Sequence, residues 1–186
     1  EALNVDAERV RTEAHHRHAH EGGNVIDTST IPARGAPLRS LVKDRVIAAP
    51  VARAWSDWAS SDGLARWLQP AGSHIELGIG GAYEIYFSMD EPEGSRGSEG
   101  CVILSYVPHE MISFTWNAPP HLALRTTNTW VTLTFAPVES NATLVRLVHT
   151  GFLEGDDWDA YHAYFDVAWD SVLDRQEAHH VAHPGG

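Results

Sequence analysis

The stretch DDWDAYHAYFDVAWDSVLDRQEAHHV, residues 156–181, has the periodicity of one long helix. Its apolar side chains recur three and four residues apart, which places them on one helix face: Trp158, Tyr161, Phe165, Ala168, Trp169 and Val172. Asp156 and Asp157 stand at the N-terminal end, where the helix dipole favours negative charge. We therefore expect a long C-terminal helix that packs its aromatic face against the rest of the chain.

Most of the remaining chain has the pattern of a sheet. Short apolar runs separated by Pro, Asn and Gly predict about seven strands, near residues 38–48, 73–77, 82–88, 101–107, 109–116, 125–137 and 143–152. Most of these strands follow one another directly, so the sheet is expected to be antiparallel. Such a sheet has one apolar face to cover, and the C-terminal helix is the only predicted element large enough to lie across it. The sequence thus predicts an α+β fold.

Three tryptophans are concentrated in WSDWASSDGLARWLQP, residues 55–70. A short helix that starts near Pro50 would carry on one face Val51, Trp55 and Trp58. A second short helix, capped by Asp62, would carry Leu64 and Trp67. We expect these two helices to close one end of the sheet, so that the sheet and all three helices enclose a space in which function resides.

The formal net charge of −12 at pH 7 restricts the classes of partner. It repels nucleic-acid phosphate and anionic lipid, and no basic cluster overrides it, so we expect no nucleic-acid binding. No apolar run is long enough to span a membrane. Cys101 is the single cysteine and lies in an apolar run, which predicts a buried, inert thiol. The chain begins at Glu1 without a methionine; we expect a cytoplasmic protein, with export after removal of a leader as the alternative.

Six strings along the chain resemble, in the same order, the SRPBCC superfamily of START and birch-pollen-allergen-like proteins: VIAAPVARAWSDWASSDGLARWL, GIGGAYEI, EGCVILSYVPHEMISFTW, VTLTF, NATLVRLVHTGF and AWDSVL. Within it, the chain is most similar to the bacterial branch related to the Hsp-90 ATPase activator. The resemblance covers residues 40–176. It implies a helix-grip fold, in which a curved antiparallel sheet of about seven strands, two short helices and a long C-terminal helix surround a cavity.

The resemblance also suggests the domain organisation. Residues 38–180 would form one helix-grip domain, followed by a tail at residues 181–186. Residues 1–37 have no counterpart in the family and are rich in polar and turn-forming residues, so we interpret them as an N-terminal arm, either mobile or docked. By the same resemblance, Trp55 and Trp58 match core aromatic positions, while Trp67 lies where the second short helix borders the cavity mouth.

Alternate residues of a strand point to the same face of a sheet, and this alternation, together with the apolar face of the long helix, predicts the lining of the cavity. His149 continues the inward row of Val145 and Leu147, either as a buried neutral imidazole or as a pocket acid or base. A filled core without a cavity is the alternative. The candidate catalytic residues are His149 and Tyr83. The candidate ligand-binding residues are Trp67, Tyr83, Ile85, Phe114, Trp116, His149, Tyr161, Phe165 and Trp169.

Two histidine groups suggest metal binding, HHRHAH at residues 15–20 and the later group of His179, His180 and His183. Neither has an accompanying cysteine or the ligand spacing of a structural zinc site, so we expect neither a metal nor a cofactor. The Gly-rich string GIGGAYEI joins two predicted strands, whereas a phosphate-binding loop joins a strand and a helix. No GxSxG nucleophile motif is present in the sequence.

Three functions follow, and binding of an apolar or aromatic small molecule in the cavity is the first. The second is a polyketide cyclase-like enzyme, which needs a positioned acid or base where a carrier needs few polar groups. The third is a protein-interaction role like that of the chaperone activator. Trp130 should point outward from its strand, so it is a candidate contact for the N-terminal arm or for the second subunit of a homodimer.

Overall fold

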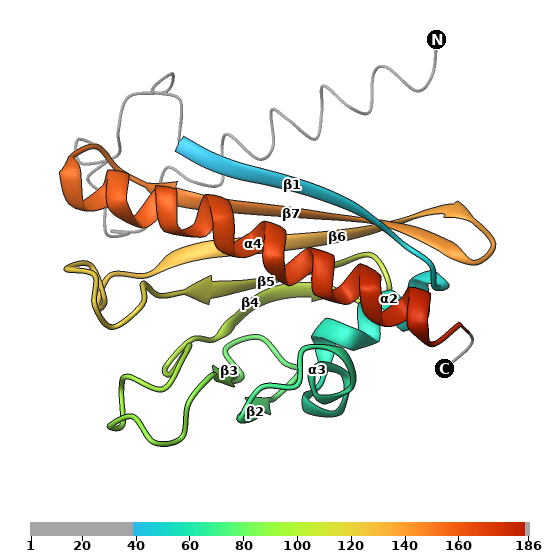
Figure 1. Cartoon of the computed structure of the whole chain (residues 1–186), viewed down its shortest axis with the longest axis horizontal. Coiled ribbons are helices and arrows are strands. Elements are labelled where there is room, and N and C mark those ends of the chain that lie inside the picture. The colour runs from blue at the N-terminus through green and yellow to red at the C-terminus, as the bar shows by residue number, and fades with distance from the viewer. Residues whose placement is uncertain (1–38, 185–186) are drawn as a thin grey trace, which may run out of the picture. The chain divides into compact units, whose positions relative to one another are not determined.

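The computed structural model describes residues 39–184, in which one long helix lies across a sheet (Figure 1). Seven strands are present among these residues: β1 (Arg39–Ile47), β2 (Gly72–Ile75), β3 (Tyr83–Tyr86), β4 (Ile103–Val107), β5 (Met111–Trp116), β6 (Thr129–Glu139) and β7 (Ala142–Phe152). Five of them form an antiparallel sheet in the order β1-β7-β6-β5-β4, and β2 pairs with β3. The predicted α+β helix-grip architecture is confirmed.

The strands are divided between two sheets, whereas the sequence suggested one sheet of about seven strands. Two isolated bridges, Ala82 to Val102 and Tyr86 to Gly97, connect β3 and the residue before it to the chain that precedes β4. Most of the connection from β3 to β4 is a polar loop, residues 88–100. In that loop the Glu99 carboxylate accepts the backbone N–H groups of Gly94 and Arg96.

Helices α2 (Val51–Ala59) and α3 (Ser61–Trp67) form where the tryptophans are concentrated. The cap of α3 differs from the predicted one. The Ser60 hydroxyl accepts the backbone N–H of Gly63 at 3.0 Å, while Asp62 lies exposed in the first turn. Ser60 takes the capping position because α3 begins at Ser61, so that Asp62 is already part of the helix.

Gly63 allows α2 and α3 to approach closely. A Cβ atom at this position would lie 2.0 Å from the carbonyl oxygen of Ser56 in α2. The approach brings the ring centroids of Trp58 and Trp67 to 4.9 Å, and the Trp67 indole N–H donates to the Asp57 carbonyl oxygen at 3.1 Å. Trp55, Trp58 and Trp67 are all buried, so the tryptophan-rich stretch serves the core.

Helix α4 (Asp156–Ala182) crosses the five-stranded sheet (Figure 1) and buries one face, formed by Tyr161, Phe165, Trp169, Leu173, Gln176 and His180. Its acidic flank lies along edge strand β1. Lys43 Nζ is 2.8 Å from Asp166 and 2.7 Å from Asp170, and hydrogen bonds to these carboxylates raise the pKa of Lys43. Arg45 Nη2 lies 2.6 Å from Asp174. These ion pairs hold one long side of α4 against the sheet.

Trp130 lies on the sheet face opposite to α4, as its position in the strand predicts, and 42% of it is exposed. The ring packs over Gly151 of the neighbouring strand, where a Cβ atom would lie 3.4 Å from two of its carbons. The predicted arm, residues 1–37, lies outside the described residues, so its contact with Trp130 stays a prediction. Contact of Trp130 with a second subunit also stays a prediction.

The predicted end of the domain at residue 180 falls within α4, which continues to Ala182. The last residues of the predicted tail, 185 and 186, lie outside the described part of the chain. Among the described helices, none combines the length and the apolar character that a membrane span requires.

Candidate functional site

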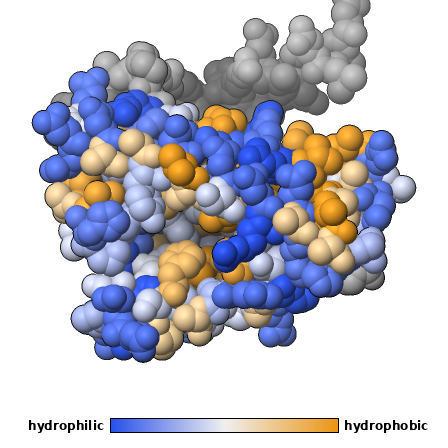
Figure 2. Space-filling model, in the orientation of Figure 1, coloured by the Kyte–Doolittle hydropathy of each residue, from blue (hydrophilic) through white to orange (hydrophobic). Residues whose placement is uncertain are grey.

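A pocket of about 500 Å³ lies between α4 and the loops that follow β3 and β5. Its apolar lining comes from several elements and comprises Trp58, Leu68, Ile85, Phe87, Trp116, Ala118, Pro119, Pro120, Phe165, Ala168, Trp169 and Val172. Figure 2 shows the side of the molecule that carries α4, and its surface is hollowed near the centre. The volume falls in the range of small-molecule sites, about 300–1,000 Å³.

One wall of the pocket is aromatic. The ring centroid of Trp169 lies 5.3 Å from that of Trp116 and 5.5 Å from that of Phe165, and the Trp116 and Phe165 centroids are 6.4 Å apart. Aromatic rings attract one another at such distances. Trp116 belongs to β5 and the other two residues to α4, so the wall spans the gap between sheet and helix. It offers flat, polarizable surface to an apolar or aromatic guest.

Arg125 holds together the two loops that form the mouth of the pocket. Its guanidinium donates to the carbonyl oxygens of Gly94 and Gly97 at 2.7 Å each. It also donates to the Ala118 carbonyl oxygen at 2.6 Å and to Asn117 Oδ1 at 2.9 Å. Because one side chain satisfies acceptors from both loops, Arg125 fixes the shape of the mouth and has little hydrogen-bonding capacity left for a ligand.

Other polar groups surround the mouth. Arg96 Nε–H donates to the Glu91 carbonyl oxygen at 3.1 Å, and the His121 ring lies edge-on to Tyr164 with centroids 5.7 Å apart. All four residues line the pocket. An apolar interior beneath a small number of polar groups is the usual composition of a site for an organic molecule.

His149 lies behind the aromatic wall, fully buried, with both ring nitrogens engaged. Trp169 Nε1–H donates to His149 Nδ1 at 2.9 Å, so Nδ1 carries no proton, because an indole nitrogen can only donate. The neutral ring therefore holds its proton on Nε2, which donates to Thr129 Oγ1 at 2.7 Å. Thr129 donates in turn to the Trp116 carbonyl oxygen at 2.9 Å. The imidazole connects α4 to the sheet and is outside the pocket lining.

Burial, with a smaller contribution from the nearby His162, lowers the pKa of His149 to about 3. The hydrogen bonds also lower the pKa of His149, because a proton on Nδ1 would point at the indole N–H of Trp169. His149 is thus neutral over the physiological pH range.

Stability should therefore fall on the acid side. The unfolded chain takes up this proton near pH 6.5 and the folded protein only near pH 3, so the unfolded state holds more protons in between. We expect the free energy of unfolding to fall below pH 6.5 by up to about 1.4 kcal/mol per pH unit from this group. The Gln amide in His149→Gln can accept from Trp169 and donate to Thr129. The free energy of unfolding of this variant, measured by urea titration between pH 4 and 7, should therefore depend less steeply on pH than that of the wild type. Exposed His74→Gln is the control, and equal slopes for wild type and His149→Gln would refute the assignment.

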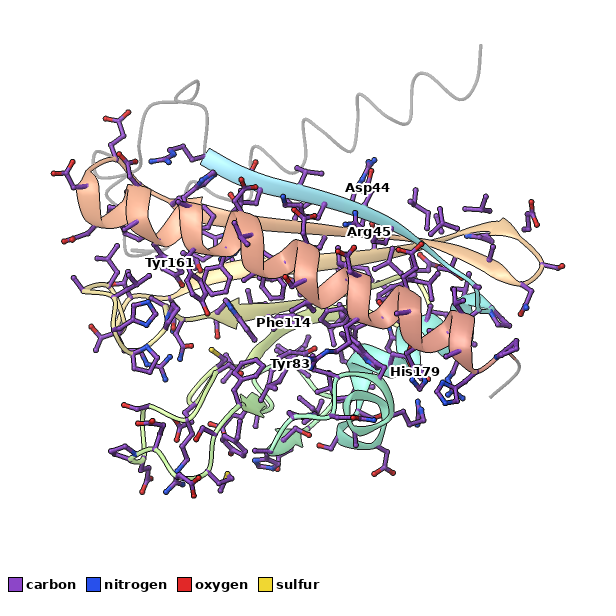
Figure 3. The ribbon with its side chains drawn as sticks, in the orientation of Figure 1. Asp44, Arg45, Tyr83, Phe114, Tyr161 and His179 are labelled. Atoms are coloured by element: carbon purple, nitrogen blue, oxygen red, sulfur yellow. The ribbon has the colours of Figure 1, made fainter. Side chains whose placement is uncertain are left out.

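Four of the predicted ligand-binding residues line the pocket: Ile85, Trp116, Phe165 and Trp169. Tyr83 and Phe114 lie outside the lining, stacked with centroids 3.8 Å apart (Figure 3). The Tyr83 hydroxyl donates to the Trp58 carbonyl oxygen at 3.0 Å, and burial raises the pKa of Tyr83 well above its usual range. The other three predicted residues are buried outside the lining as well. Trp67 lies in α3, the Tyr161 hydroxyl donates to the Trp116 carbonyl oxygen, and His149 lies behind the aromatic wall. Both candidate catalytic residues thus lie outside the pocket lining.

The sequence did not indicate the residues of the mouth, among them Ser88, Glu91, Arg96, Asn117, His121, Arg125 and Tyr164. All but Tyr164 come from loops, where no periodicity shows which way a side chain points. Two sequence features pointed to this region: the polar loop before β4 and the Pro119-Pro120 pair after β5. They predict turns, but they do not indicate that these turns border a pocket.

A second buried polar group lies where α2 meets the C-terminal part of α4. The Asp57 carboxylate, fully buried, accepts His180 Nε2–H at 2.6 Å and Gln176 Nε2–H at 3.1 Å. Gln176 Oε1 accepts the Trp58 indole N–H at 3.1 Å. Arg53 Nε lies 3.5 Å from the other carboxylate oxygen. We call Asp57, Gln176 and His180 the Asp57 cluster; it joins the two helices at the end of the pocket that Trp58 lines.

Of the two histidine groups, residues 15–20 lie outside the described chain. In the other, His179 stacks on His183 with centroids 4.7 Å apart, and His180 points to Asp57. Within residues 39–184, no three histidine, cysteine or acidic side chains gather in an arrangement that could hold a metal ion. Cys101 is buried, which raises its pKa to about 11.

Residues 48–180 match the family model of the activator of Hsp90 ATPase homolog 1-like proteins. No curated protein matches the chain.

Solved structures share the fold at low sequence identity. The Mesorhizobium loti protein MLL2253 is 20% identical with a TM-score of 0.62, over 78% of this chain and 98% of that one. PFC0360w, an HSP90 activator from Plasmodium falciparum, is 14% identical with a TM-score of 0.53, over 71% and 88%. DynU16, a protein of the dynemicin biosynthetic locus, is 14% identical with a TM-score of 0.55, over 79% and 48%.

Proposed function

The chain belongs to the family of activator of Hsp90 ATPase homolog 1-like proteins, and we propose that its function is to bind an apolar or aromatic small molecule beneath α4. The fold commonly binds hydrophobic ligands. The observation that carries the proposal is the pocket of about 500 Å³, with an aromatic wall and an apolar floor. A guest that buries most of its surface there gains roughly 25 cal/mol for each Å² of apolar area removed from water.

Binding is a better account of the pocket than catalysis. An acid–base catalyst needs a titratable group within hydrogen-bond reach of the substrate. The titratable side chains Glu91, His121 and Tyr164 line the pocket at its mouth and not in its apolar interior. His149 and Tyr83 lie outside the lining, and their polar atoms are bonded to protein groups. Arg125 is committed to the loops of the mouth. The likeness to DynU16 and to the HSP90 activator is a likeness of fold, and it adds no residue role to either alternative.

Filling the pocket should weaken ligand binding strongly without unfolding the protein. Ala168 of α4 lines the pocket, and an indole placed there by Ala168→Trp would occupy the space along the aromatic wall. We expect Nile red, an apolar dye, to bind the wild type with a blue shift, and the variant at least about tenfold more weakly. Val167→Trp is the matched control, because Val167 is the next residue on the same helix and is 70% exposed.

Dissociation constants from fluorescence titration, with thermal midpoints for each variant, measure this effect. Equal affinity in wild type, Ala168→Trp and Val167→Trp would place the dye elsewhere and contradict the proposed site.

A further inference from the structure

Arg96 is a cation at the mouth of the pocket, and most of its hydrogen-bonding capacity is unused. Its Nε–H donates to the Glu91 carbonyl oxygen at 3.1 Å. Within residues 39–184, neither Nη atom has a hydrogen bond and no carboxylate forms an ion pair with the guanidinium. Arg96 is only half-buried, and both Nη atoms retain solvent-accessible surface, so a ligand can reach them. Arg125, the other arginine of the lining, is instead committed to loop acceptors.

The backbone directs the Arg96 side chain to the pocket side of its loop. An antiparallel bridge joins Tyr86 to Gly97, and the Phe87 N–H donates to the Arg96 carbonyl oxygen at 2.7 Å. Phe87 and Arg96 are therefore opposed one residue beyond the bridge, and opposed side chains of an antiparallel pair lie on the same face. Ile85 lies on that face as well, because it is two residues from Phe87. All three residues line the pocket, with Arg96 at the rim of the apolar surface.

The acidic side chains nearby leave the charge of Arg96 available to an anion. The Glu99 carboxylate accepts two backbone N–H groups of its own loop and lies 3.7 Å from Arg125 Nη2. Glu91 lines the mouth, but its side chain is exposed and forms no ion pair with Arg96 among the described residues. Because water screens an exposed carboxylate strongly, Glu91 opposes an anion at Arg96 only weakly. A ligand that carries one negative charge would therefore find an uncompensated cation at the mouth.

We propose that the occupant of the pocket is an aromatic carboxylate, whose rings lie along Trp116 and Trp169 while its carboxylate binds Arg96 at the mouth. The inference rests on the proposed ligand binding and specifies the ligand class. Because Arg96 Nε–H already donates to the loop, the free edge of the guanidinium is the one formed by Nη1 and Nη2. A planar carboxylate matches the two parallel N–H groups of that edge, and one cation neutralises its single charge. Ser88 and Ser95, which also line the pocket, add hydroxyl donors without adding negative charge.

The test compares 2-naphthoate with 2-naphthamide, which share one ring system and differ in the charge of the polar group. Isothermal titration calorimetry at pH 7 gives the ratio of their dissociation constants, amide over carboxylate, and we expect about fivefold or more for the wild type. Arg96→Gln keeps a donor for the Glu91 carbonyl oxygen but removes the charge, so the ratio should fall to about one. Arg146→Gln is the matched control. It removes the same charge from an arginine that pairs with Asp44 on the other face of the sheet, so the ratio should stay at the wild-type value.

A second readout does not depend on the folding of either variant. In wild-type protein labelled with ¹⁵N, the Arg96 Nε–H resonance should shift with 2-naphthoate and much less with 2-naphthamide. If the two probes bind the wild type equally, or if Arg96→Gln keeps the preference for the carboxylate, the inference fails while ligand binding stands. The same holds if neither naphthalene binds but Nile red does. If none of the three compounds binds, the proposed function fails and the inference fails with it.

Discussion

Asp57→Ala is expected to lower the free energy of unfolding by about 3–5 kcal/mol, because it removes the buried acceptor that joins α2 to α4. The carboxylate is fully buried and accepts N–H groups from His180 and Gln176 of α4. The substitution would leave both donors without their partner in a desolvated site, and the half-buried Arg53 side chain would lose its ion pair. Because the Asp57 cluster fixes α4 near Trp58, ligand affinity should fall as well.

Urea denaturation monitored by circular dichroism measures this loss. Asp62→Ala is the matched control, since Asp62 is an exposed carboxylate in the neighbouring helix α3, and a loss within about 1 kcal/mol is expected for it. If both substitutions cost the same, the Asp57 cluster does not stabilise the junction of α2 and α4.

Gly63→Ala should be nearly as damaging, with a loss of about 3 kcal/mol or more. The added methyl group would lie 2.0 Å from the Ser56 carbonyl oxygen and within 3.0 Å of the Asp57 backbone, and neither is the end of a flexible side chain. The helices α2 and α3 would have to separate, which would pull the Trp67 indole from the Asp57 carbonyl oxygen.

The same exchange at Gly78 is the control for Gly63→Ala. A Cβ atom at Gly78 meets nothing within 4 Å, so Gly78→Ala should change the thermal midpoint little. Equal midpoints for the two variants would mean that the helices do not need the close approach at Gly63.

The fold was predictable because its elements have strong periodicity. Along β6 from Thr129 to Phe135 and along β7 from Ala142 to Thr150, buried residues alternate with half-buried or exposed ones, and the stripe from Tyr161 to Trp169 faces the sheet. Two features were missed. These are the division of the sheet at the loop before β4 and the capping of α3 by Ser60. The sequence did not predict them because both depend on how far an element extends, which the local sequence pattern specifies poorly.

The site was predictable only in part. The alternation of residues along β7 predicted that His149 faces inward, and it is fully buried. Its partners Thr129 and Trp169 come from other elements and satisfy both ring nitrogens within the core. An inward direction therefore did not mean contact with the pocket. The mouth depends on Arg125, a loop residue whose role follows from backbone acceptors that the folded loops bring together.

The central claim is that an aromatic small molecule binds between α4 and the sheet, and intermolecular NOEs test it most directly. With 9-fluorenone bound to methyl-labelled protein, we predict NOEs from the ligand to the methyl groups of Ile85, Ala118, Ala168 and Val172, which line the pocket from β3, the loop after β5 and α4. Val42 and Val46 are exposed on β1 and provide a second apolar surface for comparison. NOEs to Val42 or Val46 in place of the pocket methyl groups, or no NOEs at saturating ligand, would contradict the account.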